Sequence, residues 1–322
     1  MKRKLLDILR CPRDMSRLEL LDEIIEQDEI RDGILKCSSC EVEYPIQNSV
    51  PRFVTTDDYV GNFSMEWQIH SRTQMPDSND HETIETFKTR TSLTQEELTG
   101  KLVLDAGCGV GRYMSVASQY GAEVVGVDLS YSVEQAMMNV GDRPLCHVIQ
   151  ADLTNLPFDL STFDYVFSLG VLHHMPDPLN GFKALVPLIK PGGHMAISVY
   201  SSHSPYDPYR ASRRLRRITI HMNKRLLYAL TTIMVLALYP IYRIPFVKVL
   251  FMLAPISMHQ KLSWRLLDTF DCYSPRYQFT YTYREVYQWY QEQGFTDMEV
   301  LEAPVSMRGR RRLAESNTGA EK

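Results

Sequence analysis

A glycine-rich turn constrains the fold of this chain more than any other feature of the sequence. It runs from Asp105 to Gly111 as DAGCGVG, directly after the apolar run KLVL and directly before an expected helix over 111–120. Glycine is needed where the backbone adopts angles that side chains disfavour, or where it approaches a ligand closely. The turn therefore predicts a strand, a ligand-facing loop and a helix in succession.

Strands and helices alternate after this turn. Further strands are expected at AEVVGVDL, CHVIQADL, FDYVFSLG and HMAISVY, with helices near 131–139 and 179–189 between them. Such alternation predicts right-handed crossovers and a parallel sheet covered on both faces. A helix near 283–293 and the strand-like MEVLEA and VSMRGR complete the sheet. We therefore predict an α/β, doubly wound, Rossmann-like domain with a mostly parallel sheet, formed by 101–202 and 273–312.

The glycine turn does not fit a dinucleotide-binding fingerprint. Counting G-x-G-x-x-G from Gly107 places Arg112 at the third glycine, where a side chain would obstruct helix packing, so nicotinamide or flavin binding is disfavoured. Asp128 ends the next strand about 20 residues on from Gly107, where an acid reaches the hydroxyls of a bound ribose. Asp152 ends the third strand and can accept from an adenine amino group, with Leu153 packed near the ring. These positions predict an adenosine site.

The order and spacing of five motifs resemble those of class I S-adenosylmethionine-dependent methyltransferases, closest in style to the ubiquinone and menaquinone biosynthesis group. The motifs are VLDAGCGVGR, VVGVDLS, QADLTNLPF, FDYVFSLGVLHHMPDP and LIKPGGHMAISVY. The resemblance implies a methyltransferase that binds S-adenosylmethionine, with Leu169 and Gly170 beneath the sulfonium. The other cofactor-binding residues that it implies are Asp105, Gly107, Gly109, Asp128, Leu129, Asp152 and Leu153.

His174 is the candidate catalytic residue. The sulfonium methyl is already activated, so the protein mainly has to position a nucleophile and exclude water. An oxygen nucleophile of high pKa, or a carbon acid, would also need a base, and His173 and His174 follow the fourth strand where a substrate should enter. The alternative is that both histidines belong to the turn that shapes the cleft.

The insertion at 203–272 combines basic and apolar stretches. The segment 201–225 contains seven basic residues and a single acid, Asp207. The apolar run 226–242 follows it. That run is shorter than the roughly 20 residues that span a bilayer, and Pro240, Arg243 and Pro245 are expected to break it. We expect either a helical cap on the catalytic domain or a surface helix pair that contacts a membrane through 213–256. Both predict a small, hydrophobic or lipid-linked acceptor.

The segment after the apolar run is rich in tyrosine and acids and should return the chain to the mouth of the site. Candidates for substrate contact are Asp268, Asp271, Tyr273 and Tyr281. The alternative is an aromatic core that packs the cap onto the sheet.

The first 54 residues contain LLDILRCPRD, KCSSC and YPI followed by SVPRF, and they resemble the zinc-ribbon proteins that activate tRNA and translation-factor methyltransferases. A four-cysteine zinc site would place a cysteine three residues after Cys11, but Asp14 stands there. Carboxylate also ligates zinc, so Cys11, Asp14, Cys37 and Cys40 are candidate ligands of a structural zinc ion. Without metal, so small a module would be held by packing.

The remaining segments are expected to be a linker with a helical lead-in at 55–100 and a disordered tail at 313–322. A formal net charge of -4 does not favour nucleic-acid binding. The N-terminus lacks an apolar run long enough for a signal peptide, so we expect a cytoplasmic protein, with membrane association through the insertion as an option. Two other functions stay open: methylation of tRNA or protein, with the basic run on phosphates, and a non-catalytic regulatory protein that binds the cofactor.

Overall fold

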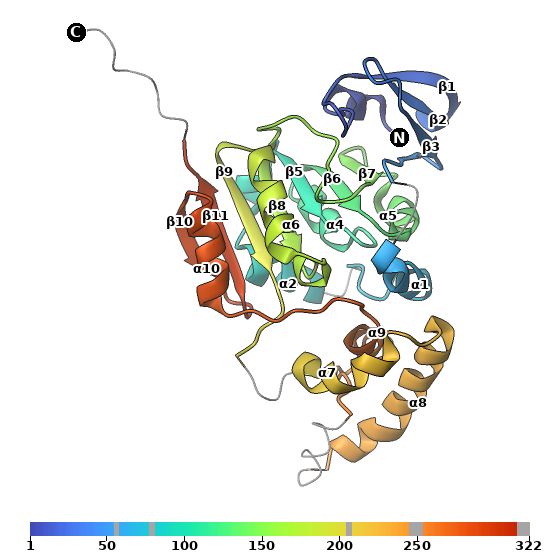
Figure 1. The fold of residues 1–322 in the computed structure, drawn as a ribbon, viewed down its shortest axis with the longest axis vertical. Helices are drawn as coiled ribbons and strands as arrows, with labels where there is room; N and C mark the ends of the chain where they lie inside the picture. The colour runs from blue at the N-terminus through green and yellow to red at the C-terminus, as the bar shows by residue number, and fades with distance from the viewer. Residues whose placement is uncertain (55–57, 77–80, 204–207, 245–253, 314–322) are drawn as a thin grey trace, which may run out of the picture.

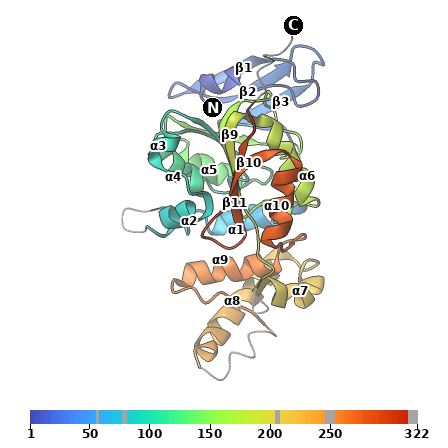
Figure 2. The same cartoon turned by 90° about the vertical axis from the view of Figure 1, so that its left-hand side faces the viewer.

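The computed structural model describes residues 1–54, 58–76, 81–203, 208–244 and 254–313. Three parts follow one another along the long axis of the molecule (Figures 1 and 2). An antiparallel N-terminal sheet lies at one end, an α/β domain in the middle, and a group of helices at the other end. The tail expected to be disordered lies outside the described residues from 314 onward.

The central sheet has, within the described residues, seven strands in the order β10-β11-β9-β8-β5-β6-β7. Strands β5 to β9 run parallel, and β11 is antiparallel to both of its neighbours. The order of the strands reverses between β5 and β8, which opens a crevice at their carboxyl ends. The strands are β5 (Leu102–Ala106), β6 (Glu123–Asp128), β7 (Cys146–Gln150), β8 (Phe163–Leu169), β9 (Ile189–Ser198), β10 (Phe295–Val300) and β11 (Ser306–Arg311).

Helices cover both faces of this sheet, which confirms the predicted doubly wound α/β class. One apolar cluster joins α2, α4 and α5 to β5, β6 and β7, and another joins α6 and α10 to the opposite face. Because both faces are covered, β7 buries all of its residues and has no exposed face. The helices are α2 (Glu82–Thr91), α3 (Gln95–Leu98), α4 (Arg112–Gln119), α5 (Ser132–Val140), α6 (Pro178–Leu185) and α10 (Tyr283–Glu292).

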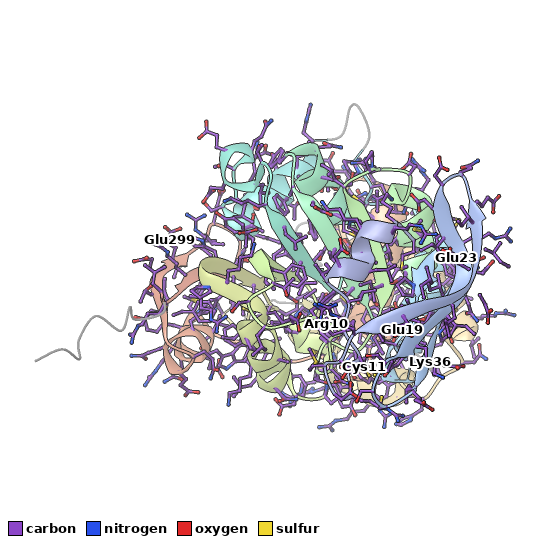
Figure 3. All side chains as sticks on the ribbon, turned by 90° about the horizontal axis from the view of Figure 1, so that it is seen from above. Arg10, Cys11, Glu19, Glu23, Lys36 and Glu299 are labelled. Carbon is purple, nitrogen blue, oxygen red and sulfur yellow. The ribbon has the colours of Figure 1, made fainter. Side chains whose placement is uncertain are left out.

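The N-terminal module is a four-stranded antiparallel sheet that follows a 3-10 helix, η1 (Arg3–Asp7). Its strands are β1 (Leu18–Glu26), β2 (Glu29–Cys37), β3 (Glu43–Gln47) and β4 (Val50–Pro51). Seen from above, Cys11, Glu19 and Lys36 lie along this module, whereas Glu299 lies at the far edge of the central sheet (Figure 3).

The module is docked onto the central α/β domain rather than standing apart. Leu5 and Leu9 belong to the same buried cluster as Phe158 of the central domain. The amide of Phe53 donates to the carbonyl of Gln150 at 2.8 Å, at the edge strand β7. The Arg52 guanidinium donates to Gln150 Oε1 at 2.7 Å, and Gln150 Nε2 donates to the carbonyl of Leu129 at 3.0 Å. A hydrogen-bonded path therefore connects the module to the loop after β6.

Among the described residues, three helices separate β9 from α10 at the other end of the molecule: α7 (Pro208–Thr219), α8 (Lys224–Tyr242) and α9 (Leu262–Tyr273). One face of α8 buries Leu227, Thr231 and Val235. By length and composition alone α8 could cross a membrane, a test that core helices of soluble proteins also pass. Of the residues expected to break the apolar run, Pro240 does not break it, because α8 continues through it. The helix ends at Tyr242, directly before Arg243, and Pro245 lies outside the described residues. Pro240 lies in the last turn of α8. Its missing N–H therefore removes a backbone hydrogen bond only at the end of the helix, where few residues follow.

Candidate active site

A cavity of about 240 Å³ opens at the carboxyl ends of β5, β6 and β8, where the strand order reverses. Its floor is the glycine turn. Gly107, Gly109 and Gly111 have φ values of 92°, 53° and 82°, in the region that side chains rarely adopt. A Cβ on Gly107 would come within 2.3 Å of the Val171 side chain. The turn is therefore a cradle that a side chain would fill.

Asp128 connects this cradle to the loop after β6. Its Oδ2 accepts a hydrogen bond from the Gly109 amide at 2.9 Å. Its Oδ1 accepts from the amide of Ser130 at 2.8 Å and from the Ser130 hydroxyl at 2.7 Å. Burial raises the pKa of Asp128, while these hydrogen bonds oppose the rise. The carboxylate lines the cavity with Leu129 next to it.

The structure brings most of the expected cofactor residues to this cavity and leaves two outside its lining. Asp105 lies beneath the turn, and burial, then the charge of Asp128, raises its pKa well above the usual range. Asp152 accepts from the amide and hydroxyl of Thr154 at 2.8 and 2.7 Å, so this carboxylate stabilises its own turn. The expected cofactor residues that do line the cavity are Gly107, Gly109, Asp128, Leu129, Leu153, Leu169 and Gly170.

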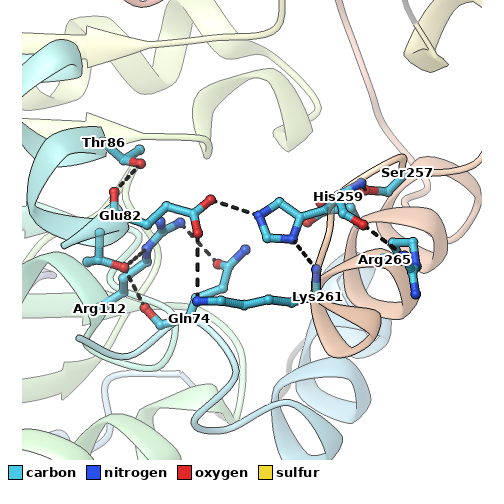
Figure 4. A network of polar contacts seen from close by, with 10 residues as sticks. Gln74, Glu82, Thr86, Arg112, Ser257, His259, Lys261 and Arg265 are labelled. Carbon is cyan, nitrogen blue, oxygen red and sulfur yellow. Dashed lines mark hydrogen bonds and ion pairs between the residues drawn. The ribbon is translucent and has the colours of Figure 1, made fainter. Parts of the chain in front are cut away.

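The opposite wall of the cavity comes from α1 (Gly61–Ile69) and α9. Both helices are held in place by polar contacts: Asn62 Nδ2 donates to Ser274 Oγ at 3.2 Å, at the end of α9. In Figure 4, Glu82 on α2 contacts His259 at 2.8 Å, and Lys261 lies 3.8 Å from the same carboxylate. The start of α9 is thus fixed to the central domain.

This wall contains residues that the motifs did not indicate. Glu66 and Trp67 come from α1, inside the segment expected to be a linker. Arg90 on α2 and Arg112 on α4 also line the cavity. Arg112 donates to Thr83 Oγ1 and Gln74 Oε1, both at 3.1 Å (Figure 4). In the sequence, Arg112 was informative only as an obstacle to dinucleotide binding.

His174 lies in the 3-10 helix η3 (Leu172–His174) after β8 and lines the cavity. Its Nδ1 is 2.9 Å from the carbonyl oxygen of Tyr277. Because a carbonyl only accepts, Nδ1 carries the proton and Nε2 presents a lone pair. That Nε2 lies 4.0 Å from Oδ1 of Asp271 on α9, and the Tyr200 hydroxyl donates to Oδ2 of the same acid. Burial lowers the pKa of His174, which favours the neutral ring.

The other candidates for catalysis or substrate contact divide between the cavity and the core. Asp268 and Asp271 line the cavity. His173 is buried behind His174, and its ring nitrogens have no hydrogen-bond partner in the described part of the chain. Tyr273, at the end of α9, donates to the carbonyl of Pro255 at 2.8 Å. The Tyr281 ring packs against Trp289 at 4.8 Å, so neither tyrosine lines the cavity.

The N-terminal module brings together the four expected metal ligands. One donor atom from each of Cys11, Asp14, Cys37 and Cys40 lies within 4.8 Å of all the others. The Sγ atoms of Cys11 and Cys40 are 3.6 Å apart, and Cys37 Sγ lies 3.4 Å from Asp14 Oδ1. Zinc–sulfur bonds of about 2.3 Å in a tetrahedron place sulfurs about 3.8 Å apart, so this donor set fits zinc.

Two family models match the chain. Residues 104–197 match the model described as a methyltransferase domain, and residues 2–49 match the model described as Trm112p-like protein. The chain carries a class I methyltransferase domain behind a Trm112-like module. The resemblance to both families is thereby confirmed, and S-adenosylmethionine is the cofactor of this type of domain.

Curated relatives are similar to about a third of this chain. The ubiquinone biosynthesis O-methyltransferase of Coxiella burnetii is 36% identical over 106 residues, which are 32% of this chain and 45% of that protein. The probable tRNA methyltransferase 9B of Homo sapiens is 34% identical over 110 residues, or 33% of this chain and 23% of that protein. The matched part is thus less than half the length of either relative.

Two solved structures show low overall similarity. Phosphoethanolamine N-methyltransferase 2 of Haemonchus contortus, in complex with S-adenosyl-L-methionine, is 18% identical, with a TM-score of 0.44 over 80% of this chain and 47% of that chain. The complex of the Haloferax volcanii Trm112 activator with a methyltransferase has a TM-score of 0.39 and 20% identity. It covers 51% of this chain and 68% of that chain.

Proposed function

We propose that this protein transfers the methyl group of S-adenosylmethionine to an acceptor bound in the half of the cavity between His174 and α9. One observation carries the proposal: a single cavity is lined both by the glycine cradle with Asp128 and by His174 with Asp271. Gly107, Gly109, Asp128, Leu129, Leu153 and Leu169 would hold the cofactor, with Asp105 and Asp152 supporting the loops around it. Bound S-adenosylmethionine supplies a methyl group that is already activated.

The protein's own contribution is then positioning, dehydration and proton transfer. Both α1 and α9 cover the cavity, so an acceptor bound beneath them is shielded from water and held near the cofactor. The neutral His174 presents Nε2 as a proton acceptor, and the Tyr277 carbonyl fixes the ring. We propose His174 as the catalytic base.

The acceptor is proposed to be a small, hydrophobic or lipid-like molecule that is reached from a membrane surface. The outward face of α8 exposes Leu226, Leu230, Ile233 and Leu236, with Ile233 62% exposed. Lys224 and Arg225 stand at the start of α8, directly before this apolar face, and α7 carries the exposed Arg213, Arg214 and Arg217. A helix with such an apolar face beside basic residues is suited to lie in the interface of an anionic bilayer.

Vesicle flotation tests this membrane contact. The protein should float with vesicles of phosphatidylcholine and phosphatidylglycerol, and less with phosphatidylcholine alone. The double variant Leu230→Glu with Ile233→Glu should stay at the bottom of the gradient. A control with the same charge change, Met138→Glu with Leu160→Glu, alters residues that are 71% and 70% exposed elsewhere and should still float. Equal flotation of the two double variants would refute the proposal.

Transfer of labelled methyl tests the function itself. The purified protein, cell extract and S-adenosylmethionine with a labelled methyl group should give label in a small-molecule or lipid fraction. His174→Ala should reduce transfer about 100-fold or more while the affinity for S-adenosylhomocysteine stays the same. Binding of S-adenosylhomocysteine without transfer to any fraction would instead support a regulatory protein.

A second candidate function is methylation of tRNA or protein. Two observations favour it: the similarity to a probable tRNA methyltransferase, and the exposed Arg213, Arg214 and Arg217 on α7, which could contact phosphates. Label in the nucleic-acid or protein fraction of the same experiment, with binding that weakens steeply as salt rises, would favour this candidate over a small-molecule acceptor.

A further inference from the structure

Three acidic side chains face the acceptor half of the cavity. Glu66 comes from α1, and Asp268 and Asp271 come from α9, where a spacing of three residues places them on one face of the helix. Within the part of the chain that the structure describes, no lysine or arginine lies within 4.0 Å of any of these carboxylates. The one ion-pair distance in this range joins Asp271 to His174.

Glu66 is the most unusual of the three. Its side chain lines the cavity, yet the residue is only 1% exposed, and its Oε2 has no hydrogen-bond partner among the described residues. Burial, followed by the charges of Asp271 and Asp268, raises its pKa well above the usual range. A buried carboxylate without a partner is unfavourable, so the raised pKa favours the protonated, neutral form of Glu66 while no cation is near. A positively charged ligand group would stabilise the ionised carboxylate.

The gap between His174 and Asp271 points to the same ligand chemistry. His174 Nε2 presents a lone pair, and Asp271 Oδ1, 4.0 Å away, also has no hydrogen-bond donor among the described residues. Two acceptors that face each other need a donor between them. A hydroxyl has one hydrogen to donate, whereas a protonated primary amine has three. An ammonium group can therefore satisfy both atoms and Glu66 as well.

The nearby arginines form no ion pair with the three acids among the described residues, and an aromatic ring lies next to His174. Arg112 bonds to Gln74 and Thr83, and Arg216 on α7 donates to Gln278. Arg90 lines the same cavity, with Nη1 3.9 Å from where a Cβ on Gly170 would stand. Phe63, which lines the cavity, packs against His174 at 5.1 Å and offers a ring face of the kind that alkylammonium groups prefer.

We propose that the acceptor is an amine, bound as its ammonium ion by Glu66, Asp268 and Asp271, and methylated on nitrogen. This inference rests on the proposed function. The ammonium nitrogen gives one proton to His174 Nε2, and its freed lone pair forms the new bond to the methyl carbon. The electrons of the breaking sulfur–carbon bond stay on sulfur, so S-adenosylhomocysteine leaves as a neutral thioether and the product is a methylammonium ion.

Blocking amines in the extract tests the nature of the acceptor. Acetic anhydride in bicarbonate buffer acetylates amines and leaves hydroxyl groups largely intact. Labelling by the full-length protein should be lost after this treatment and kept in a mock-treated extract, and mass spectrometry should find the labelled methyl on nitrogen. A labelled methyl on oxygen or carbon overturns the inference. Partition between organic solvent and water then separates a lipid headgroup amine from a free amine.

Charge-removing variants test the three acids. Glu66→Gln and Asp268→Asn should each raise the apparent KM for the acceptor fraction by about 10-fold to 100-fold, because a charge-assisted hydrogen bond is lost. The affinity for S-adenosylhomocysteine, measured by calorimetry, should stay within about twofold. Glu292→Gln on the exposed side of α10 makes the same chemical change and should alter neither quantity.

The outcomes separate the alternatives. Weaker binding of S-adenosylhomocysteine by Glu66→Gln would assign Glu66 to the cofactor and overturn the inference. An unchanged apparent KM in both variants would overturn it as well. Absence of transfer by the unaltered protein, with S-adenosylhomocysteine still bound, is a failure of the proposed function, which the untreated extract reveals before any variant is made.

Discussion

Replacing Asp268 with asparagine should stabilise the protein at neutral pH. Burial, then the charge of Asp271, raises the pKa of Asp268 from 3.8 to about 6, although the Ser257 hydroxyl donates to its Oδ2 at 3.0 Å. Between these two pH values the folded protein binds a proton that the unfolded chain has released. The free energy of unfolding therefore falls as pH rises from about 4 to about 6, and the loss remains in full above pH 6.

The magnitude follows from the same two values. A pKa raised from 3.8 to about 6 corresponds to about 3 kcal/mol of unfolding free energy at pH 7.5. Asparagine keeps an oxygen that can accept from Ser257 and removes the charge. Asp268→Asn should thus gain about 3 kcal/mol at pH 7.5 and close to nothing at pH 4, where the aspartate of the folded protein is already neutral.

Urea unfolding at pH 4, 5.5 and 7.5 measures this difference. Tryptophan fluorescence is a suitable signal, because Trp264 lies near the start of α9. The midpoint should rise by about 1 M urea at pH 7.5 and by progressively less at lower pH. Asp142→Asn, which neutralises an exposed acid, serves as the control. Equal stabilisation at pH 4 and pH 7.5, or destabilisation at pH 7.5, would refute the reasoning.

Three further predictions concern the cofactor, the metal and the docked module. Asp128→Asn should weaken S-adenosylhomocysteine binding about 30-fold or more in calorimetry, because the Gly109 amide loses a charged acceptor; an unchanged affinity would remove Asp128 from the cofactor site. Purified protein should contain about one zinc ion per chain by mass spectrometry, and Cys37→Ser should lose it; metal-free protein after gentle purification contradicts the zinc site. Arg52→Met should lower the free energy of unfolding by about 2 kcal/mol in urea, because Gln150 Oε1 is left without its donor, and a loss below about 0.5 kcal/mol would show that the docking relies on other contacts.

The sequence predicted the fold and most of the residues that line the cavity around the glycine turn, because local rules govern both. Apolar strands that alternate with helices specify the sheet, and its strand ends meet at one edge. The glycines of the turn are visible in the sequence because their backbone angles exclude other residues. Asp128 follows from its position at the end of a strand.

The acceptor half could not be predicted in the same way. Helix α1 buries Asn62, Ser64 and Glu66, so a search for apolar periodicity finds no buried face in it. Its position depends on contacts with distant residues: Ser64 Oγ accepts from the Tyr131 amide at 3.1 Å. Asp152 illustrates the reverse case, since its strand-end position is as expected but its side chain bonds to Thr154 nearby. The hydrogen bonds from Thr154 determine which way the Asp152 side chain points.

The docking of the N-terminal module has a consequence for how the catalytic domain can be handled. Without residues 1–54, the edge of β7 would lose its partner and Phe158 its cover from Leu9. An unpaired strand edge beside a newly exposed apolar patch is a template for self-association. A catalytic domain truncated in this way is therefore expected to aggregate. In the continuous chain the module is covalently attached, so the catalytic domain does not depend on binding a separate protein to remain soluble.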